Sequence, residues 1–188
     1  MSLFPHVRAR RVELRPGVAA DGLLFYQLLL RVGVENLPPP ARVAGQFFDN
    51  SAALFRIQRR GSGEVIGYAT LRELGQAGHV RLAVYVEKDK SRHGVSGEAL
   101  YLVVNYAFAA YDVDRILCRT TEESFAYVRG AGDDDQKPIG IFPGHRYFRG
   151  RLLDLHHFLV MRDEWTAFWN DAEHHIVGPG RSVTAAGT

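Results

Sequence analysis

The residues most suited to chemistry lie between Arg81 and Phe108, where an apolar strand pattern, a turn of small and polar residues and a long amphipathic helix follow one another. This order places the free N–H groups of a helix N-terminus at the turn. Because these amides and the helix dipole both favour negative charge, the turn is suited to bind a phosphate. The strand lacks the glycine fingerprint of a dinucleotide fold, so the segment indicates another coenzyme that carries a pyrophosphate.

The rest of the chain supplies the elements that must position this turn. Gly61-Ser62-Gly63 separates two strand patterns and predicts a hairpin. In Ser96–Tyr111 the apolar residues recur at helical spacing on one face, which makes this the clearest helix. Adjacent strands that can pair as hairpins, with helices between them, favour the α+β class. Strands are predicted at Arg10–Arg15, Ala52–Arg59, Val65–Leu74, His79–Glu87, Arg115–Thr120 and twice within Ile139–Asp163, helices at Ala19–Val32, Ala41–Phe48 and Thr121–Arg129, and a helix or turn at Trp165–His174.

Length and composition fit one globular domain, with 188 residues of which 46% are hydrophobic and 23% charged. We expect a single domain over residues 1–177 and a flexible tail of small and polar residues over 178–188. No apolar run is long enough to cross a bilayer, and the first residues lack the apolar core of a signal peptide. The net charge of +2 is too small to indicate nucleic acid. The single cysteine, Cys118, rules out internal disulfides and suits a reducing cytoplasm.

The segment Ser91–Leu100 resembles the turn R-G-x-G-x-G/A and the helix start of the GNAT superfamily of acetyl-CoA-dependent N-acyltransferases. Gly94 keeps the central glycine of that turn. Val65-Ile66-Gly67-Tyr68 is similar to the Ile-Gly-Tyr strand of the same superfamily. The matches keep their order from about Val12 to Trp165, and they are most similar to the branch of ribosomal-protein N-terminal acetyltransferases (RimJ/RimL-like).

The resemblance implies the GNAT fold, a mixed and mostly antiparallel sheet with splayed middle strands and flanking helices, and it implies acetyl-CoA as co-substrate. The gap between Arg81–Glu87 and Arg115–Thr120 would hold the pantetheine arm, and the amides of Arg92–Gly97 would hold the pyrophosphate. The alternative is an ordinary glycine turn before a helix. The coenzyme-binding residues expected are Val84, Tyr85, Val86, Ser91, Arg92, His93, Gly94, Val95, Ser96, Gly97 and Ser124.

The catalysis that the resemblance implies is direct acyl transfer from the CoA thioester to an amine, with most of the work done by positioning. The amide of Val86 would polarise the thioester carbonyl. Related enzymes often have Glu at the position of Arg81, which stays protonated. His79 lies two residues earlier on the same side of the strand, and it is either the base or a solvent-exposed histidine. Ser124 and Tyr127 take the positions of the family's Asn and Ser, so Tyr127 is either the acid for the leaving thiolate or a packing residue.

Other polar residues are of types suited to metal binding, nucleophilic chemistry or acceptor binding. His156 and His157 are adjacent on a strand, where side chains point to opposite faces, and no metal site is expected. Cys118 lies in mid-strand and is expected to be a structural thiol rather than a nucleophile. The acidic run Asp133–Asp135 is either solvated or attracts a cationic acceptor. Three arginines of a hairpin tip are either solvated or meet the 3′-phosphate of CoA or an acidic acceptor: Arg146, Arg149 and Arg151.

Two functions stay open from the sequence. The first is an N-acyltransferase that moves an acetyl or other short acyl group to a primary amine, on a small molecule or at a protein N-terminus. The second is a non-catalytic acyl-CoA-binding member of the same fold, suggested by the missing Glu and Asn. Either would act as a monomer or homodimer, without nucleic acid or membrane. Ala19–Asn50 and Phe142–Asp154 contain no recognisable amine-binding motif, so the acceptor is not identified.

Overall fold

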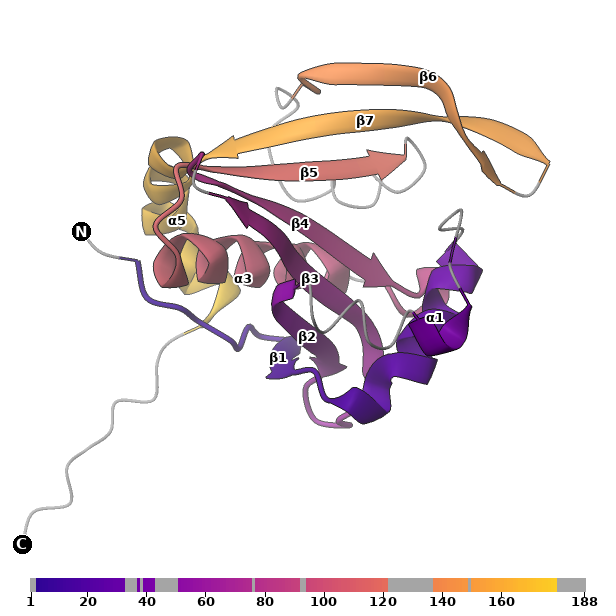
Figure 1. Cartoon of the computed structure of the whole chain (residues 1–188). Coiled ribbons are helices and arrows are strands. Elements are labelled where there is room, and N and C mark those ends of the chain that lie inside the picture. Colours follow the sequence, from indigo (N-terminus) through magenta and orange to yellow (C-terminus); the bar gives the residue numbers. More distant parts are fainter. Residues whose placement is uncertain are drawn as a thin grey trace, which may run out of the picture.

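The computed structural model describes residues 3–32, 37, 39–42, 51–75, 77–91, 94–121, 137–148 and 150–178. Within these ranges the chain forms one seven-stranded sheet with helices on both faces (Figure 1). The α+β class is therefore confirmed. None of the helices in this part of the chain is long and apolar enough to span a membrane. The cytoplasmic location stays a prediction.

The sheet has the strand order β1-β2-β3-β4-β5-β7-β6. Every neighbouring pair is antiparallel except β4 and β5, which run parallel. A parallel pair needs a crossover connection, and the helix α3 (Val95–Ala110) provides it. The strands are β1 (Val12–Pro16), β2 (Ser51–Arg59), β3 (Val65–Gly75), β4 (His79–Val86), β5 (Arg115–Thr121), β6 (Gly140–Phe148) and β7 (Arg151–Met161).

The helices divide between the two faces of the sheet. The helix α5 (Arg162–Ile176) packs beside α3 on one face, and α1 (Gly22–Val32) packs on the other. The short 3-10 helix η1 (Ala19–Asp21) leads into α1, and η2 (Lys88–Lys90) follows β4. We call the two sides the α3 face and the α1 face.

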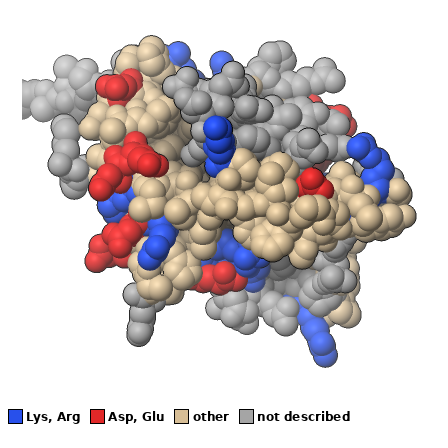
Figure 2. All heavy atoms as spheres, turned by 90° about the horizontal axis from the view of Figure 1, so that it is seen from above, with Lys and Arg blue, Asp and Glu red and all other residues tan. Residues whose placement is uncertain are grey.

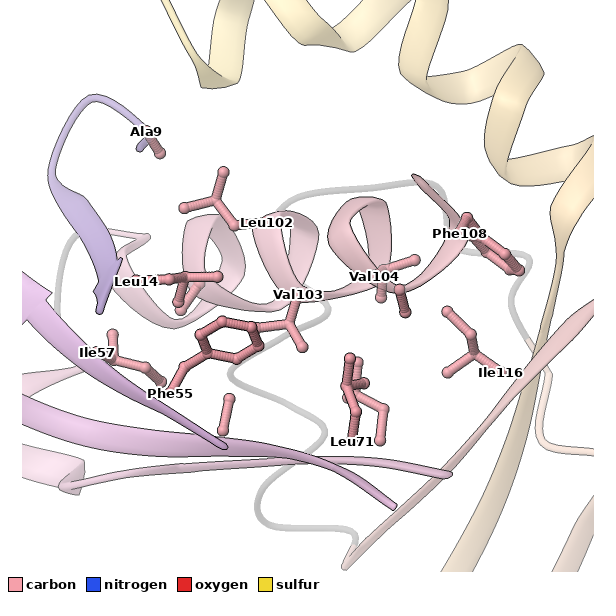
Figure 3. Packing of buried hydrophobic residues seen from close by; sticks show 14 of the residues in the cluster. Ala9, Leu14, Phe55, Ile57, Leu71, Leu102, Val103, Val104, Phe108 and Ile116 are labelled. Atoms are coloured by element: carbon pink, nitrogen blue, oxygen red, sulfur yellow. The ribbon is translucent and has the colours of Figure 1, made fainter. Parts of the chain in front are cut away.

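The main hydrophobic core lies on the α3 face. Figure 3 shows Val103 of α3 against Phe55 of β2, and Phe108 above Ile116 of β5. All four side chains are almost completely buried. On the α1 face the cluster is smaller and joins three residues of α1 to one residue each of β2 and β3: Phe25, Leu28, Leu29, Leu54 and Tyr68.

The C-terminal end of α3 is fixed by a side chain of α5. The guanidinium group of Arg162 donates to the carbonyl oxygens of Phe108, Tyr111 and Val113 at 2.7–2.8 Å. The last carbonyls of a helix have no intrahelical donors, so Arg162 satisfies groups that would otherwise need water. This contact ties α5 to α3 and helps to hold the helix against the sheet.

Most of the predicted elements are confirmed, with small changes at their ends. Pro143-Gly144 interrupts β6, because its pairing with β7 shifts between Phe142 and Arg146. The segment predicted as a helix or turn is the helix α5, which begins at Arg162. Asp163 is therefore in the first turn of a helix, where its charge is favourable, and not at the end of a strand. The predicted helices Ala41–Phe48 and Thr121–Arg129 and the tail 178–188 lie almost entirely outside the described residues.

Candidate active site

The strands β4 and β5 separate half-way along their length. Their parallel pairing starts with His79 and Arg115 and ends with Leu82 and Cys118. Beyond this point β4 runs on to Val86, and the two strands diverge (Figure 1). The splayed middle strands that the resemblance implies are therefore confirmed. We call the space between the diverging ends the split.

Backbone amides of β4 point into the split. The N–H of Glu87 donates to the carbonyl oxygen of Ile66 in β3 at 3.2 Å. Successive N–H groups along a strand point to opposite sides, so the amides of Val86 and Val84 point away from β3. In the described part of the chain, no strand pairs with β4 on that side beyond Leu82. The split therefore contains backbone donors that are available to a ligand.

Gly67 allows β3 to approach this end of β4. It is the register partner of Val86, and a Cβ atom on it would clash with the carbonyl oxygen of Tyr85. The same atom would lie 3.0 Å from the Cα of Val86. Steric exclusion thus explains the glycine of the Val65–Tyr68 motif, because a larger residue would displace the backbone that presents the Val86 amide.

The helix α3 begins shortly after β4 ends, with Gly94 as its N-cap residue. Gly94 has φ 77°, in the left-handed region that favours glycine. The N–H of Glu98 donates to the carbonyl oxygen of Gly94 at 3.0 Å, which is the first hydrogen bond of the helix. The amides of Val95–Gly97 therefore have no acceptor within the helix. This geometry is suited to a phosphate, and the phosphate site itself stays a prediction.

Arg11 lies against the start of α3. Its N–H donates to Oε2 of Glu98 at 2.8 Å, and its Nε is 3.7 Å from Oε1 of the same carboxylate. A Cβ atom on Gly94 would lie 2.7 Å from Nη1 of Arg11. A guanidinium group at a helix N-terminus adds a charged donor for a phosphate. No sequence pattern indicates this residue, because Arg11 precedes β1 and is far from the turn in the chain.

The predicted coenzyme and catalytic residues divide into three groups. Val84, Val86 and Val95–Gly97 come together around the split and the helix start. Ser91 follows η2 and is half-buried. Gly94 belongs to the first group as the N-cap of α3, and His79 and Tyr85 also lie in β4. Four predicted positions lie outside the described residues: Arg92, His93, Ser124 and Tyr127.

His79 is not near these groups. It is the first residue of β4 and pairs with Arg115 at the closed end of the β4–β5 ladder. The strand from His79 to Val86 spans about 23 Å, at roughly 3.3 Å per residue. Proton transfer at the Val86 end by His79 would need a connecting chain of water or a different substrate pose.

Tyr85 points to the α1 face, where its ring lies 5.5 Å from that of Phe25 in α1. Burial raises the pKa of Tyr85, and the positive charges of Arg72, Arg146 and Arg81 oppose this effect. The hydroxyl is therefore protonated at neutral pH and can act as a hydrogen-bond donor. Any contact of Tyr85 with a coenzyme on the α3 side of the split would use its backbone.

Tyr68 and Asp21 form a polar contact on the α1 face. The Tyr68 hydroxyl donates to Oδ1 of Asp21 at 3.3 Å. Burial and the negative charge of Asp21 raise the pKa of Tyr68 to about 12. Nε of Arg56 lies 3.5 Å from the same carboxylate. Asp21 is thus held by a hydroxyl and a guanidinium, which fixes the start of α1 to β2 and β3.

His157 is a candidate base that sequence reasoning missed. It is the register partner of Arg119, the first β5 residue beyond the end of the β4–β5 ladder. Burial lowers the pKa of His157, and the positive charges of Arg119 and His145 lower it further. The imidazole is therefore neutral at pH 7 and able to accept a proton. His156 pairs with Thr120 on the opposite face, as expected for adjacent strand residues.

Neither a thiol nucleophile nor a metal centre is favoured at the split. Cys118 packs against the main core, and burial raises its pKa to about 12, so the thiol is protonated at neutral pH. The described residues contain no group of three or more His, Cys, Asp or Glu side chains that could hold a metal ion.

A hollow of about 770 Å³ lies at the other end of α3 from Gly94. Its lining includes Phe108, Tyr111, Arg162 and Asn170. The guanidinium group of Arg162 is already bound to three carbonyl oxygens of the α3 end. We therefore place the site at the split, where unpaired backbone donors and a helix N-terminus occur together.

The chain is similar to known proteins in sequence and in structure. Residues 44–129 match the family model of the acetyltransferase (GNAT) domain, and this stretch contains β3, β4, α3 and β5. The protein is also similar to solved structures across most of its length. A probable GNAT-family acetyltransferase from Chromobacterium violaceum is 18% identical with a TM-score of 0.62, and the match covers 88% of this chain and 92% of that one. The chain has the GNAT fold.

Two further solved structures show the same fold. Mutant forms of the spermidine/spermine N-acetyltransferase SpeG from Vibrio cholerae are 12% identical with a TM-score of 0.70, covering 84% of this chain and 98% of that one. A GCN5-related N-acetyltransferase from Brucella melitensis is 22% identical with a TM-score of 0.62, and the match covers 90% of this chain and 85% of that one. No curated protein sequence matches significantly. At these identities the GNAT fold is established, and the RimJ/RimL-type branch stays a prediction.

Proposed function

We propose that this GNAT-fold protein is an acetyl-CoA-dependent N-acetyltransferase that acts on a primary amine by direct transfer. The observation that supports it best is that the split in the sheet and the start of α3 occur together at the end of β4. Backbone donors for a thioester and for a pyrophosphate are then supplied by consecutive elements of the chain. In the reaction the thioester C–S bond breaks, a C–N bond forms, the amine loses a proton and the thiolate gains one.

The coenzyme is held mainly by backbone groups in this proposal. The amides of Val95–Gly97 donate to the pyrophosphate, and Arg11 adds a charged donor beside them. The amides of Val84 and Val86 face the pantetheine arm, and one of them donates to the thioester carbonyl oxygen, where negative charge develops. Acetyl-CoA, when bound, supplies the activated acetyl group.

The proton transfers are assigned to side chains. Tyr127 remains the proposed acid for the leaving thiolate. For the base, His157 is better placed than His79, because it pairs with Arg119 next to the split and is neutral at pH 7. A neutral imidazole there takes the proton of the incoming ammonium, directly or through water.

A non-catalytic acyl-CoA-binding protein is the second candidate, and one contact favours it. Nη2 of Arg81 is 2.8 Å from the carboxylate of Glu73, so the position at which related enzymes often have Glu is held by an ion pair. Such a protein would keep the backbone donors and bind the coenzyme without turnover.

The test is CoA release from acetyl-CoA in the presence of a panel of primary amines, together with the shift in unfolding temperature on adding acetyl-CoA. We expect stabilisation by acetyl-CoA and amine-dependent release of CoA. Stabilisation with no turnover of any amine would favour the binding protein. An absence of stabilisation would contradict both candidates. Tyr127→Phe should slow release throughout the pH profile, and an unchanged profile would remove Tyr127 as the acid.

A further inference from the structure

The α1 face of the sheet is rich in arginine. Arg72 of β3 and Arg81 of β4 are direct register partners, so they leave the sheet on the same side. Leu117 of β5 is the parallel partner of Arg81, which places Arg115 and Arg119, two positions on either side of Leu117, on this face as well. Like charges opposite one another destabilise a strand pair, so the chain maintains this arrangement at a cost.

Arg146 joins the group from the hairpin of β6 and β7, where it pairs with Leu153. Its charge acts on the hydroxyl of Tyr85 together with the charges of Arg72 and Arg81. Charges from β3, β4 and β6 therefore act on one side chain at the open end of β4. His157 has a similar environment, with the charges of Arg119 and His145 acting on it.

Carboxylates balance only part of the charge of these arginines within the described ranges. Arg81 is bound by Glu73, whose side chain is 54% exposed and whose φ of 53° lies in the left-handed region. In the ranges that the structure describes, neither Arg119 nor Arg146 has a carboxylate within ion-pair distance. Figure 2, seen from above, shows acidic side chains mainly at the left, the end where α5 lies in Figure 1, and basic side chains also around the middle.

The acceptor must reach the split from this face. On the α3 face, Val84 and Val86 pack against the main core, which α3 covers. On the α1 face, Tyr85 lies beside the open end of β4, and the charges of Arg72, Arg146 and Arg81 act on its hydroxyl. An amine that enters from the α1 face therefore passes the guanidinium groups before it meets the thioester.

We propose that the α1 face binds an acceptor amine that also carries a carboxylate, with Arg81 and Arg146 as its main ligands. This inference rests on the proposed function and names the substrate class of that site. The planar guanidinium group matches a carboxylate with two hydrogen bonds, and arginine is suited to such recognition. The exposed carboxylate of Glu73 holds Arg81 until the carboxylate of the acceptor replaces it. A polyamine such as spermidine would meet repulsion on the same face.

The test compares matched acceptors that differ only in charge. L-leucine, L-methionine and L-phenylalanine are each assayed beside the corresponding amide, with rates corrected for the fraction of free amine, and spermidine is assayed as the polycation. We expect kcat/KM to be at least about 10-fold higher for each acid than for its amide. The variants Arg81→Gln and Arg146→Gln should reduce that ratio towards one, and Arg146→Lys should retain part of it. Arg151→Gln removes a charge from the same hairpin at its turn and is the control that should keep the ratio.

A second arm measures the anion site without turnover. Glutarate and putrescine are compared at equal ionic strength for their shift of the unfolding temperature, in wild type and in Arg146→Gln. We expect the dicarboxylate to stabilise the wild type more than the diamine, and Arg146→Gln to lose this difference. The inference is overturned, while the proposed function stands, if acetyl-CoA binds but the amides and spermidine are acetylated with the same kcat/KM as the acids. If acetyl-CoA does not bind, the proposed function fails, and the glutarate arm alone decides whether the anion site exists.

Discussion

The two faces of the sheet differ in how they make contact with a ligand. On the α3 face, the donors of the split and of the helix start are backbone amides, and the side chains around them form the apolar core. On the α1 face, the apolar cluster is small, and the side chains beside the diverging strands include arginine, histidine and tyrosine. The comparison indicates that coenzyme binding depends on backbone geometry, and that the choice of acceptor depends on side chains.

The division between the faces can be tested by separating their effects. Changes on the α1 face should alter turnover and acceptor choice while acetyl-CoA still binds. Changes at the start of α3 should alter coenzyme affinity while the acceptor preference is kept.

The largest effect is expected for the base on the α1 face. His157→Gln removes the group that accepts the ammonium proton, so kcat/KM for the amine should fall by about 10²-fold or more. The wild-type profile should lose activity as the pH falls, because protonation removes the base, with a midpoint below 6.5, the ordinary pKa of histidine. Initial rates across the pH range measure this. His79→Gln is the matched control, and an acidic limb that disappears only in that variant would return the role to His79.

A stability difference between the two faces is expected next. Leu102 is completely buried in the main core, and Figure 3 shows it pointing toward α5. Leu102→Ala should lower the free energy of unfolding by about 3 kcal/mol or more. Leu28→Ala in the smaller cluster should cost less, about 2 kcal/mol, because fewer neighbours surround that residue. Chemical denaturation measures both, and a larger loss for Leu28→Ala would contradict the ranking of the two clusters.

A smaller effect is expected at the helix start. Gly94→Ala places a Cβ atom on a residue with φ 77°, where it would also clash with Arg11. Relief of this clash would displace the free amides of Val95–Gly97. Acetyl-CoA affinity, measured by calorimetry, should fall by roughly 10-fold, about 1.4 kcal/mol, with the acid-to-amide preference unchanged. Gly63→Ala is the control, since Gly63 also has positive φ (69°) and a Cβ atom there would contact nothing within 4 Å. Equal losses in both variants would show a general effect of backbone strain.

The smallest effect is expected at the cysteine. Direct transfer forms no acyl-enzyme, and the Cys118 thiol is protonated at neutral pH, so Cys118→Ala should change kcat by less than about two-fold if the fold is kept. Thiol titration of the native protein at pH 8 should also be slow. A loss of turnover with an intact unfolding curve would indicate a covalent intermediate at Cys118 and contradict direct transfer.

The features that could be predicted from the sequence are those set by local pattern. Alternation and helical spacing identified the strands and α3, and the Gly94 turn indicated the free amides at the start of α3. The Val65–Tyr68 motif indicated β3 by resemblance, although the close approach at Gly67 is known only from the structure. Each of these depends on backbone conformation, which neighbouring residues largely determine.

The features that escaped prediction depend on residues far apart in the chain. Arg11 meets Glu98 across 87 positions, and no periodicity links them. The distance of His79 from the open end became clear only from the β4–β5 register. The combined effect of Arg72, Arg81 and Arg146 on Tyr85 likewise required the pairing of β3 with β4 and the position of the β6 hairpin.

The central claim is that the coenzyme lies between the split and the start of α3. Hydrogen exchange of backbone amides, read residue by residue with and without acetyl-CoA, tests it most directly. We expect slower exchange at Val84, Val86 and Val95–Gly97 when acetyl-CoA is present, and little change at the C-terminal end of α3. Protection confined to the hollow beside Arg162, or no protection at the split, would contradict it.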